Sequence, residues 1–67
     1  MKRDQNYINR LEKGDVVRLS NGEKVEIDST NDFGGIRAHT VDQGPNQYVR
    51  FFDKTGKGNL GGDIETP

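Results

Sequence analysis

The chain offers few of the side chains on which enzymes and metal sites depend. Its 67 residues include one histidine, His39, and no cysteine. A metal site needs more nitrogen or sulfur donors than this, and a catalytic triad needs a nucleophile beside its histidine. None of the hydroxyl residues lies in a recognisable nucleophile motif; they are Ser20, Ser29, Thr30, Thr40, Thr55 and Thr66. The sequence therefore predicts no catalytic residue, no metal site and no cofactor, and we expect a protein that is not an enzyme.

Two short motifs resemble ligand-binding loops but lack the context that such loops need. Segment 56–61, GKGNLG, matches G-x-G-x-x-G, yet only six residues follow it and no phosphate-binding helix fits there. Segment 28–35, DSTNDFGG, has the acidic spacing of a calcium loop. Its sixth position is Phe33 instead of glycine, and the twelfth, His39, is not a carboxylate. We expect both segments to form turns.

Segment 48–53, YVRFFD, carries bulky side chains on both faces of a predicted strand. If Val49 and Phe51 fill the core, the alternate residues point outward, next to side chains of the preceding strand. Aromatic rings interleaved with arginine suit a protein–protein hot spot. The sequence thus predicts a partner-binding site, flanked by the loop 28–35, that consists of Arg37, His39, Tyr48, Arg50 and Phe52.

Three alternatives to a protein partner remain open for this surface. The same rings and cations suit base stacking and phosphate contact, in a nucleic-acid site formed by Arg37, Tyr48, Arg50, Lys54 and Lys57. Ten basic and eleven acidic residues give a net charge of -1, which lacks the basic excess typical of such proteins. A second copy of the chain, or the N-terminal helix of the same chain, would also cover the surface.

Segment 14–27, GDVVRLSNGEKVEI, predicts a β-hairpin, because two apolar runs flank an Asn-Gly pair. A two-residue turn would set apolar side chains opposite polar ones. A three-residue loop, 20–22, instead places Val17 opposite Val25, with Gly22 in the left-handed conformation. We therefore expect one buried face that consists of Val17, Leu19, Val25 and Ile27.

Segment 4–13, DQNYINRLEK, predicts a short helix. Asp4 can cap its start, and Gly14 can take the left-handed conformation just past its end. One face of this helix carries Tyr7, Ile8 and Leu11. A helix of this length is marginal in water, so it should form only if that face docks on the rest of the molecule.

The second half of the chain predicts three further strands. Segments 36–41 and 48–53 form a pair around the loop 42–47, with Val41 opposite Tyr48, and the inward face carries Ile36, Ala38, Thr40, Val49 and Phe51. A short last strand would turn Leu60 and Ile64 inward. Five short strands separated by turns predict a mainly β fold, a small five-stranded barrel with a short N-terminal helix. We expect residues 1–13 to form the helix or arm and residues 14–67 the barrel domain.

Apolar residues are too sparse for a membrane protein. They make up 28% of the chain, and no segment approaches the roughly 20 apolar residues that span a bilayer. The first residues, MKRDQNYINR, are basic but have no apolar run behind them, so they do not form a signal peptide. We expect a cytoplasmic protein.

Segment 11–27, LEKGDVVRLSNGEKVEI, resembles the opening of small Src-homology-3-like barrel proteins of bacteria and tailed phages. The matching residues are Gly14, Asp15, Val17, Leu19 and Gly22. KOW-type modules also show this pattern, but their second glycine-rich step is missing here. The resemblance implies a small barrel with a binding role, such as that of a phage or bacterial accessory protein.

Overall fold

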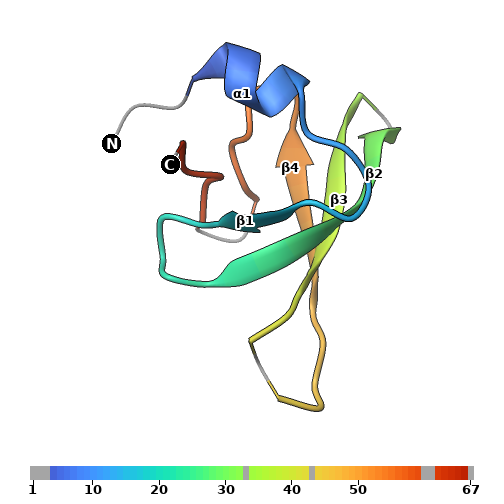
Figure 1. Cartoon of the computed structure of the whole chain (residues 1–67), viewed down its shortest axis with the longest axis vertical. Helices are drawn as coiled ribbons and strands as arrows, with labels where there is room; N and C mark the ends of the chain where they lie inside the picture. The colour runs from blue at the N-terminus through green and yellow to red at the C-terminus, as the bar shows by residue number, and fades with distance from the viewer. Residues whose placement is uncertain (1–3, 33, 43, 60–61, 67) are drawn as a thin grey trace.

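The protein is mainly β: four antiparallel strands form one meander sheet in the order β1-β2-β3-β4, and a single short helix precedes them (Figure 1). The computed structural model describes residues 4–32, 34–42, 44–59 and 62–66. The elements are α1 (Gln5–Asn9), β1 (Val16–Arg18), β2 (Lys24–Asp32), β3 (Gly35–Thr40) and β4 (Val49–Asp53). The loop between β3 and β4 projects from the end of the molecule opposite α1.

Helix α1 begins as predicted but ends earlier. The side chain of Asp4 accepts a hydrogen bond from the N–H of Asn6, as expected of a capping residue. The helix ends at Asn9 instead of residue 13, because the chain must turn to enter β1. The Asp15 carboxylate accepts the N–H of Glu12 at 2.9 Å and holds this turn. Gly14 (φ +96°) belongs to the turn and does not cap the helix.

The first hairpin has the predicted register. Val17 lies opposite Val25, and the N–H of Leu19 donates to the carbonyl of Glu23 at 2.8 Å. The loop therefore has three residues, and Gly22 has the positive φ (+92°) that its last position favours. The four side chains of the predicted face are all buried; they are Val17, Leu19, Val25 and Ile27.

The register predicted for the second hairpin is wrong by one residue. Ile36 lies opposite Phe52 and Ala38 opposite Arg50, whereas the prediction placed Arg37 opposite Phe52. Thr40 fixes the observed register: its N–H donates to the Tyr48 carbonyl (2.9 Å), and its buried hydroxyl accepts the Tyr48 N–H (3.0 Å). The shift reverses the two faces of β4, since successive side chains of a strand point to opposite sides.

The sheet is not closed into the predicted five-stranded barrel. Residues 62–66 make a single bridge to the first hairpin, Leu19 with Ile64, and hydrogen bonds on either side of it. The carbonyl of Gly56, in the turn after β4, accepts the N–H of Ile64. Ile64 is buried, as predicted, while Leu60 lies outside the described residues. One bridge, and no regular fifth strand, holds the described residues of this segment. The glycine-rich sequence that precedes them has no run of alternating side chains from which a strand could form.

The core lies between the inner side of the sheet, helix α1 and the C-terminal segment. Among the residues that the structure describes, its apolar members are Ile8, Leu11, Val17, Leu19, Val25, Ile27, Ile36, Ala38, Phe52 and Ile64. Ile8 confirms that the helix docks on the rest of the molecule, and Tyr7 packs at the margin of the core. Leu11, which follows the helix, is buried as well. Within the described residues, no helix is long and apolar enough to cross a membrane.

Candidate binding surface

The solvent side of β3 and β4 presents a surface of two rows, which we call the outer face: Arg37 with Phe51, and His39 with Val49. These residues are direct cross-strand partners. Partners in an antiparallel pair project to the same side of the sheet and lie close together. The outer face therefore places an aromatic ring next to a guanidinium and a valine next to an imidazole.

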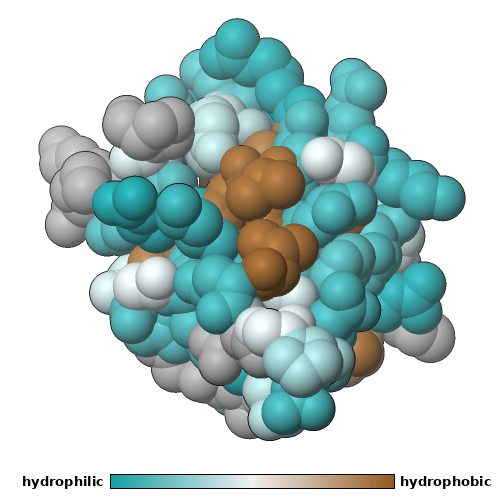
Figure 2. Space-filling model, turned by 60° about the horizontal axis from the view of Figure 1, so that its bottom comes forward, coloured by the Kyte–Doolittle hydropathy of each residue, from teal (hydrophilic) through white to brown (hydrophobic). Residues whose placement is uncertain are grey.

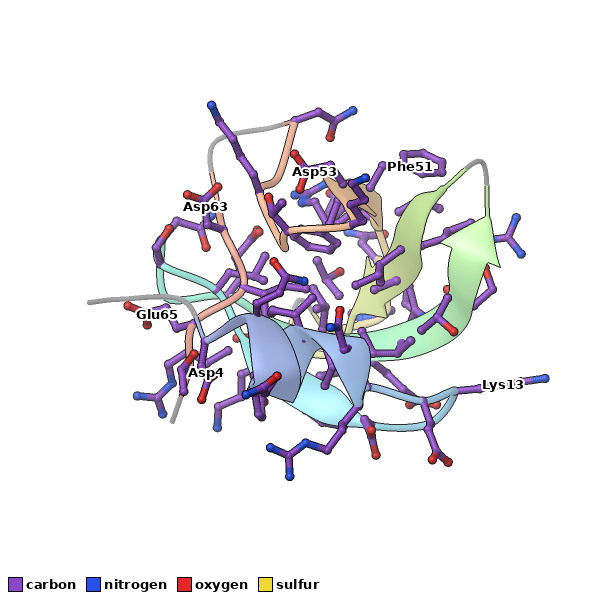
Figure 3. The ribbon with its side chains drawn as sticks, turned by 90° about the horizontal axis from the view of Figure 1, so that it is seen from above. Asp4, Lys13, Phe51, Asp53, Asp63 and Glu65 are labelled. Atoms are coloured by element: carbon purple, nitrogen blue, oxygen red, sulfur yellow. The ribbon has the colours of Figure 1, made fainter. Side chains whose placement is uncertain are left out.

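Both apolar members of the outer face are exposed. Val49 is 49% exposed and Phe51 46%, although the sequence analysis placed both in the core. Figure 3 shows Phe51 projecting at the periphery, on the far side of the sheet from α1. Seen from the side of the β3–β4 loop, the molecule is largely hydrophilic with a small apolar patch (Figure 2). Exposed rings and aliphatic groups on such a surface are the groups that a partner can remove from water.

His39 lies between carboxylates of β2. Its Nδ1 is 2.8 Å from Oδ1 of Asp28, and its Nε2 is 3.9 Å from Oε1 of Glu26. These contacts fix the orientation of the imidazole ring next to Val49. The described residues contain no group of three histidine, aspartate or glutamate side chains arranged to hold a metal ion.

The free edge of β4 is partly covered by the chain that follows it. Asn59 donates its N–H to the carbonyl of Phe51 (3.3 Å), and Asp53 donates to the carbonyl of Lys57 (2.9 Å). A small hollow next to Phe51 is lined by Lys57 and Asn59 as well. These bonds cover the strand edge at Phe51 and Asp53, so the face of β4, more than its edge, is available for contact.

Tyr48 and Arg50 lie apart from the outer face, on the other side of β4. The Arg50 guanidinium lies over the Tyr48 ring, 5.6 Å from its centroid. Arg50 also donates two hydrogen bonds to Glu23, from Nε to Oε1 and from Nη2 to Oε2, each 3.2 Å long. The hydrogen bond from Arg50, and a second from Asn21, lower the pKa of Glu23 below its ordinary value. The positive charge of Arg50 is therefore neutralised within the molecule.

The structure separates the five residues predicted to bind a partner. Arg37 and His39 lie on the outer face, Tyr48 and Arg50 on the opposite side, and Phe52 is buried at 5% exposure in the core. Neither Phe51 nor Val49 was assigned to the site from the sequence. In YVRFFD, both faces of the strand carry bulky side chains. Alternation alone could therefore not show which face is buried, or that Phe51 and Val49 are exposed.

The structure brings the predicted nucleic-acid residues together only in part: Arg37 and Lys57 both lie next to Phe51, whereas Tyr48 and Arg50 lie on the other side of β4. Lys54 is in the turn after β4, where its carbonyl accepts the side-chain amide of Gln5 from the helix (2.8 Å). Lys57 lines the hollow next to Phe51.

No protein-family model, curated protein or solved structure matches this chain. Its function is therefore inferred from these surfaces.

Proposed function

We propose that this chain is a non-enzymatic binding protein that contacts another protein through its outer face. The observation that supports this is the exposure of Phe51 and Val49 side by side, in a chain that is only 28% hydrophobic. A partner would cover the Phe51 ring and Val49 at the centre of the contact. Arg37 and His39 would form its polar rim, an arrangement typical of protein interfaces.

The distribution of charge favours a protein partner over a nucleic acid. Phosphate binding requires several cations on one surface. Arg50 is held by Glu23, and Asp28 and Glu26 surround His39 on the sheet. Carboxylates next to the outer face would repel phosphates, whereas they give a protein partner specific polar contacts.

Two predictions from the sequence belong to this proposal. The similarity of residues 11–27 to Src-homology-3-like proteins suggests a small accessory protein of a phage or bacterium. The expected cytoplasmic location would place it among intracellular partners. Neither prediction depends on the register of β4.

A matched pair of substitutions tests the proposed function. Phe51→Ser removes the exposed ring of the outer face, and Tyr48→Ser removes a ring that is equally exposed, 48%, on the other side of β4. Each protein is immobilised and used to capture proteins from nuclease-treated lysate of the native host. We expect the wild type and Tyr48→Ser to retain the same protein, and Phe51→Ser to lose it.

Two outcomes would contradict the proposal. One is capture by Phe51→Ser that equals that of the wild type. The other is a wild type that retains no protein at all. Sedimentation equilibrium of the purified wild type separates a foreign partner from a second copy of the chain. We expect a monomer, and a dimer that Phe51→Ser dissociates would identify the chain itself as the occupant.

A further inference from the structure

A second hollow lies along the opposite edge of the sheet, next to β1. It is lined by residues of the helix, the first hairpin and the C-terminal segment, among them Tyr7, Val16, Arg18, Lys24, Glu65 and Thr66. Val16 is 55% exposed there. Helix α1 and the C-terminal segment meet at one end, where Asp4 donates its N–H to the Thr66 hydroxyl (2.7 Å). Figure 3 shows Asp4 and Glu65 near each other on this side of the molecule.

The edge of β1 is paired over only part of its length. The main-chain N–H and carbonyl groups of Val17 and Leu19 point toward β2. Because these groups alternate in direction along a strand, those of Val16 and Arg18 point toward the free edge. The N–H of Glu65 donates to the carbonyl of Arg18 (2.9 Å). Among the described residues, the hydrogen bonds of the C-terminal segment reach Arg18 and go no further. The N–H and carbonyl of Val16 therefore remain as a short free strand edge that opens into the hollow.

The hollow also carries an excess of positive charge. Arg18 and Lys24 lie directly opposite each other across β1 and β2. Like charges in this position destabilise a sheet. Within the described part of the chain, neither cation forms an ion pair, and Glu65 is the one carboxylate among the described lining residues. Two cations next to one carboxylate give the hollow a net positive charge, which favours binding of an anionic group from another molecule.

The hollow is lined by groups of different character. Burial and the Asp15 carboxylate raise the pKa of Tyr7, which provides an aromatic ring with a neutral hydroxyl. Arg18 and Lys24 provide the groups that favour an anion. Val16 provides an exposed aliphatic side chain for contact with the occupant.

We propose that this hollow binds an extended peptide segment of another protein that carries an acidic side chain. The segment adds to the free edge of β1 by hydrogen bonds to Val16, and its carboxylate lies within reach of Arg18 and Lys24. Strand addition supplies affinity from main-chain groups, and side-chain contacts supply selectivity. The site shares no residue with the outer face and does not depend on the function proposed for it.

Selection from a library of randomised short peptides tests the proposal. The library is selected on the wild type, on the double variant Arg18→Gln/Lys24→Gln, and on the control Lys13→Gln. Because each substituted residue is exposed, the fold should be retained, which thermal unfolding checks. We expect selection on the wild type and on the control to yield acidic peptides. The affinity of these peptides for the double variant should be about tenfold lower than for the wild type.

The position of a selected peptide decides between outcomes. Amide shifts in ¹H–¹⁵N NMR spectra should concentrate at Val16, Arg18 and Lys24. Selected peptides without acidic residues, or shifts confined to β4, would overturn the proposal. Binding of a single-stranded oligonucleotide that depends on Arg18 and Lys24, with no acidic peptide selected, would assign the hollow to nucleic acid and overturn it as well.

Discussion

Arg50 of β4 and Glu23, which precedes β2, form a two-point ion pair that joins the first hairpin to the last strand of the sheet. Both hydrogen bonds are 3.2 Å long, and the two side chains are only 20% and 18% exposed. The pair occupies the side of β4 that carries Phe52, where the sequence analysis expected an open contact surface. The ion pair therefore contributes to stability and holds Arg50 on the side of β4 opposite to the outer face.

Loss of this ion pair should destabilise the protein moderately. Charge-assisted hydrogen bonds of limited exposure contribute about 1 to 2 kcal/mol, less than a fully buried pair would. We expect Arg50→Gln and Glu23→Gln each to lower the free energy of unfolding by this amount. The double variant should lose little more than either single variant. Additive losses in urea unfolding would show that the two side chains do not interact.

The same ion pair should make the free energy of unfolding depend on pH in the acidic range. The pKa of Glu23 is lower in the folded protein than in the unfolded chain, so the unfolded chain takes up the proton first. This contribution is fully present above the ordinary pKa of glutamate and is lost as the pH falls through the lowered pKa. We expect urea unfolding to show that the free energy of unfolding falls less for Arg50→Gln than for the wild type between neutral pH and about pH 3. Equal losses would contradict the assignment.

The two adjacent phenylalanines should respond very differently to truncation. Phe52 is 5% exposed and belongs to the core, while Phe51 is 46% exposed. Phe52→Ala should lower the free energy of unfolding by about 3 kcal/mol or more, because it leaves a cavity. Phe51→Ala should change it by less than about 1 kcal/mol. Chemical denaturation of the two variants distinguishes the observed register from the predicted one, which requires the opposite ranking.

Gly56 should tolerate a side chain less well than Gly44. Both glycines have positive φ angles, +86° and +66°. A Cβ at Gly56 would lie 2.8 Å from Cδ1 of Ile8, under the helix, whereas a Cβ at Gly44 would meet nothing within 4 Å. Gly44→Ala should cost only the backbone strain of about 1 kcal/mol, and Gly56→Ala clearly more. Thermal unfolding of both variants measures the difference, and equal midpoints would show that Ile8 yields easily.

The sequence alone determined the first hairpin and the docking face of the helix. In segment 14–27, four of the five apolar residues alternate on one side and Val16 alone lies on the other, and the Asn-Gly pair limits the loop length, so a single register buries Val17 and Val25. Ile8 and Leu11 are the apolar residues nearest this hairpin in sequence, and both are buried. Local pattern and tertiary packing agree here, which makes these elements predictable.

The tertiary structure alone decided the second hairpin, and with it the candidate site. Segment 48–53 has bulky groups on both faces, and a loop as long as 42–47 does not fix the register. Packing of Phe52 against the core, the Thr40 bonds to Tyr48 and the ion pair with Glu23 select one face for the interior. The ion pair and the packing of Phe52 join residues far apart in the sequence, so alternation along one strand could not show that Phe51 and Val49 remain in solvent.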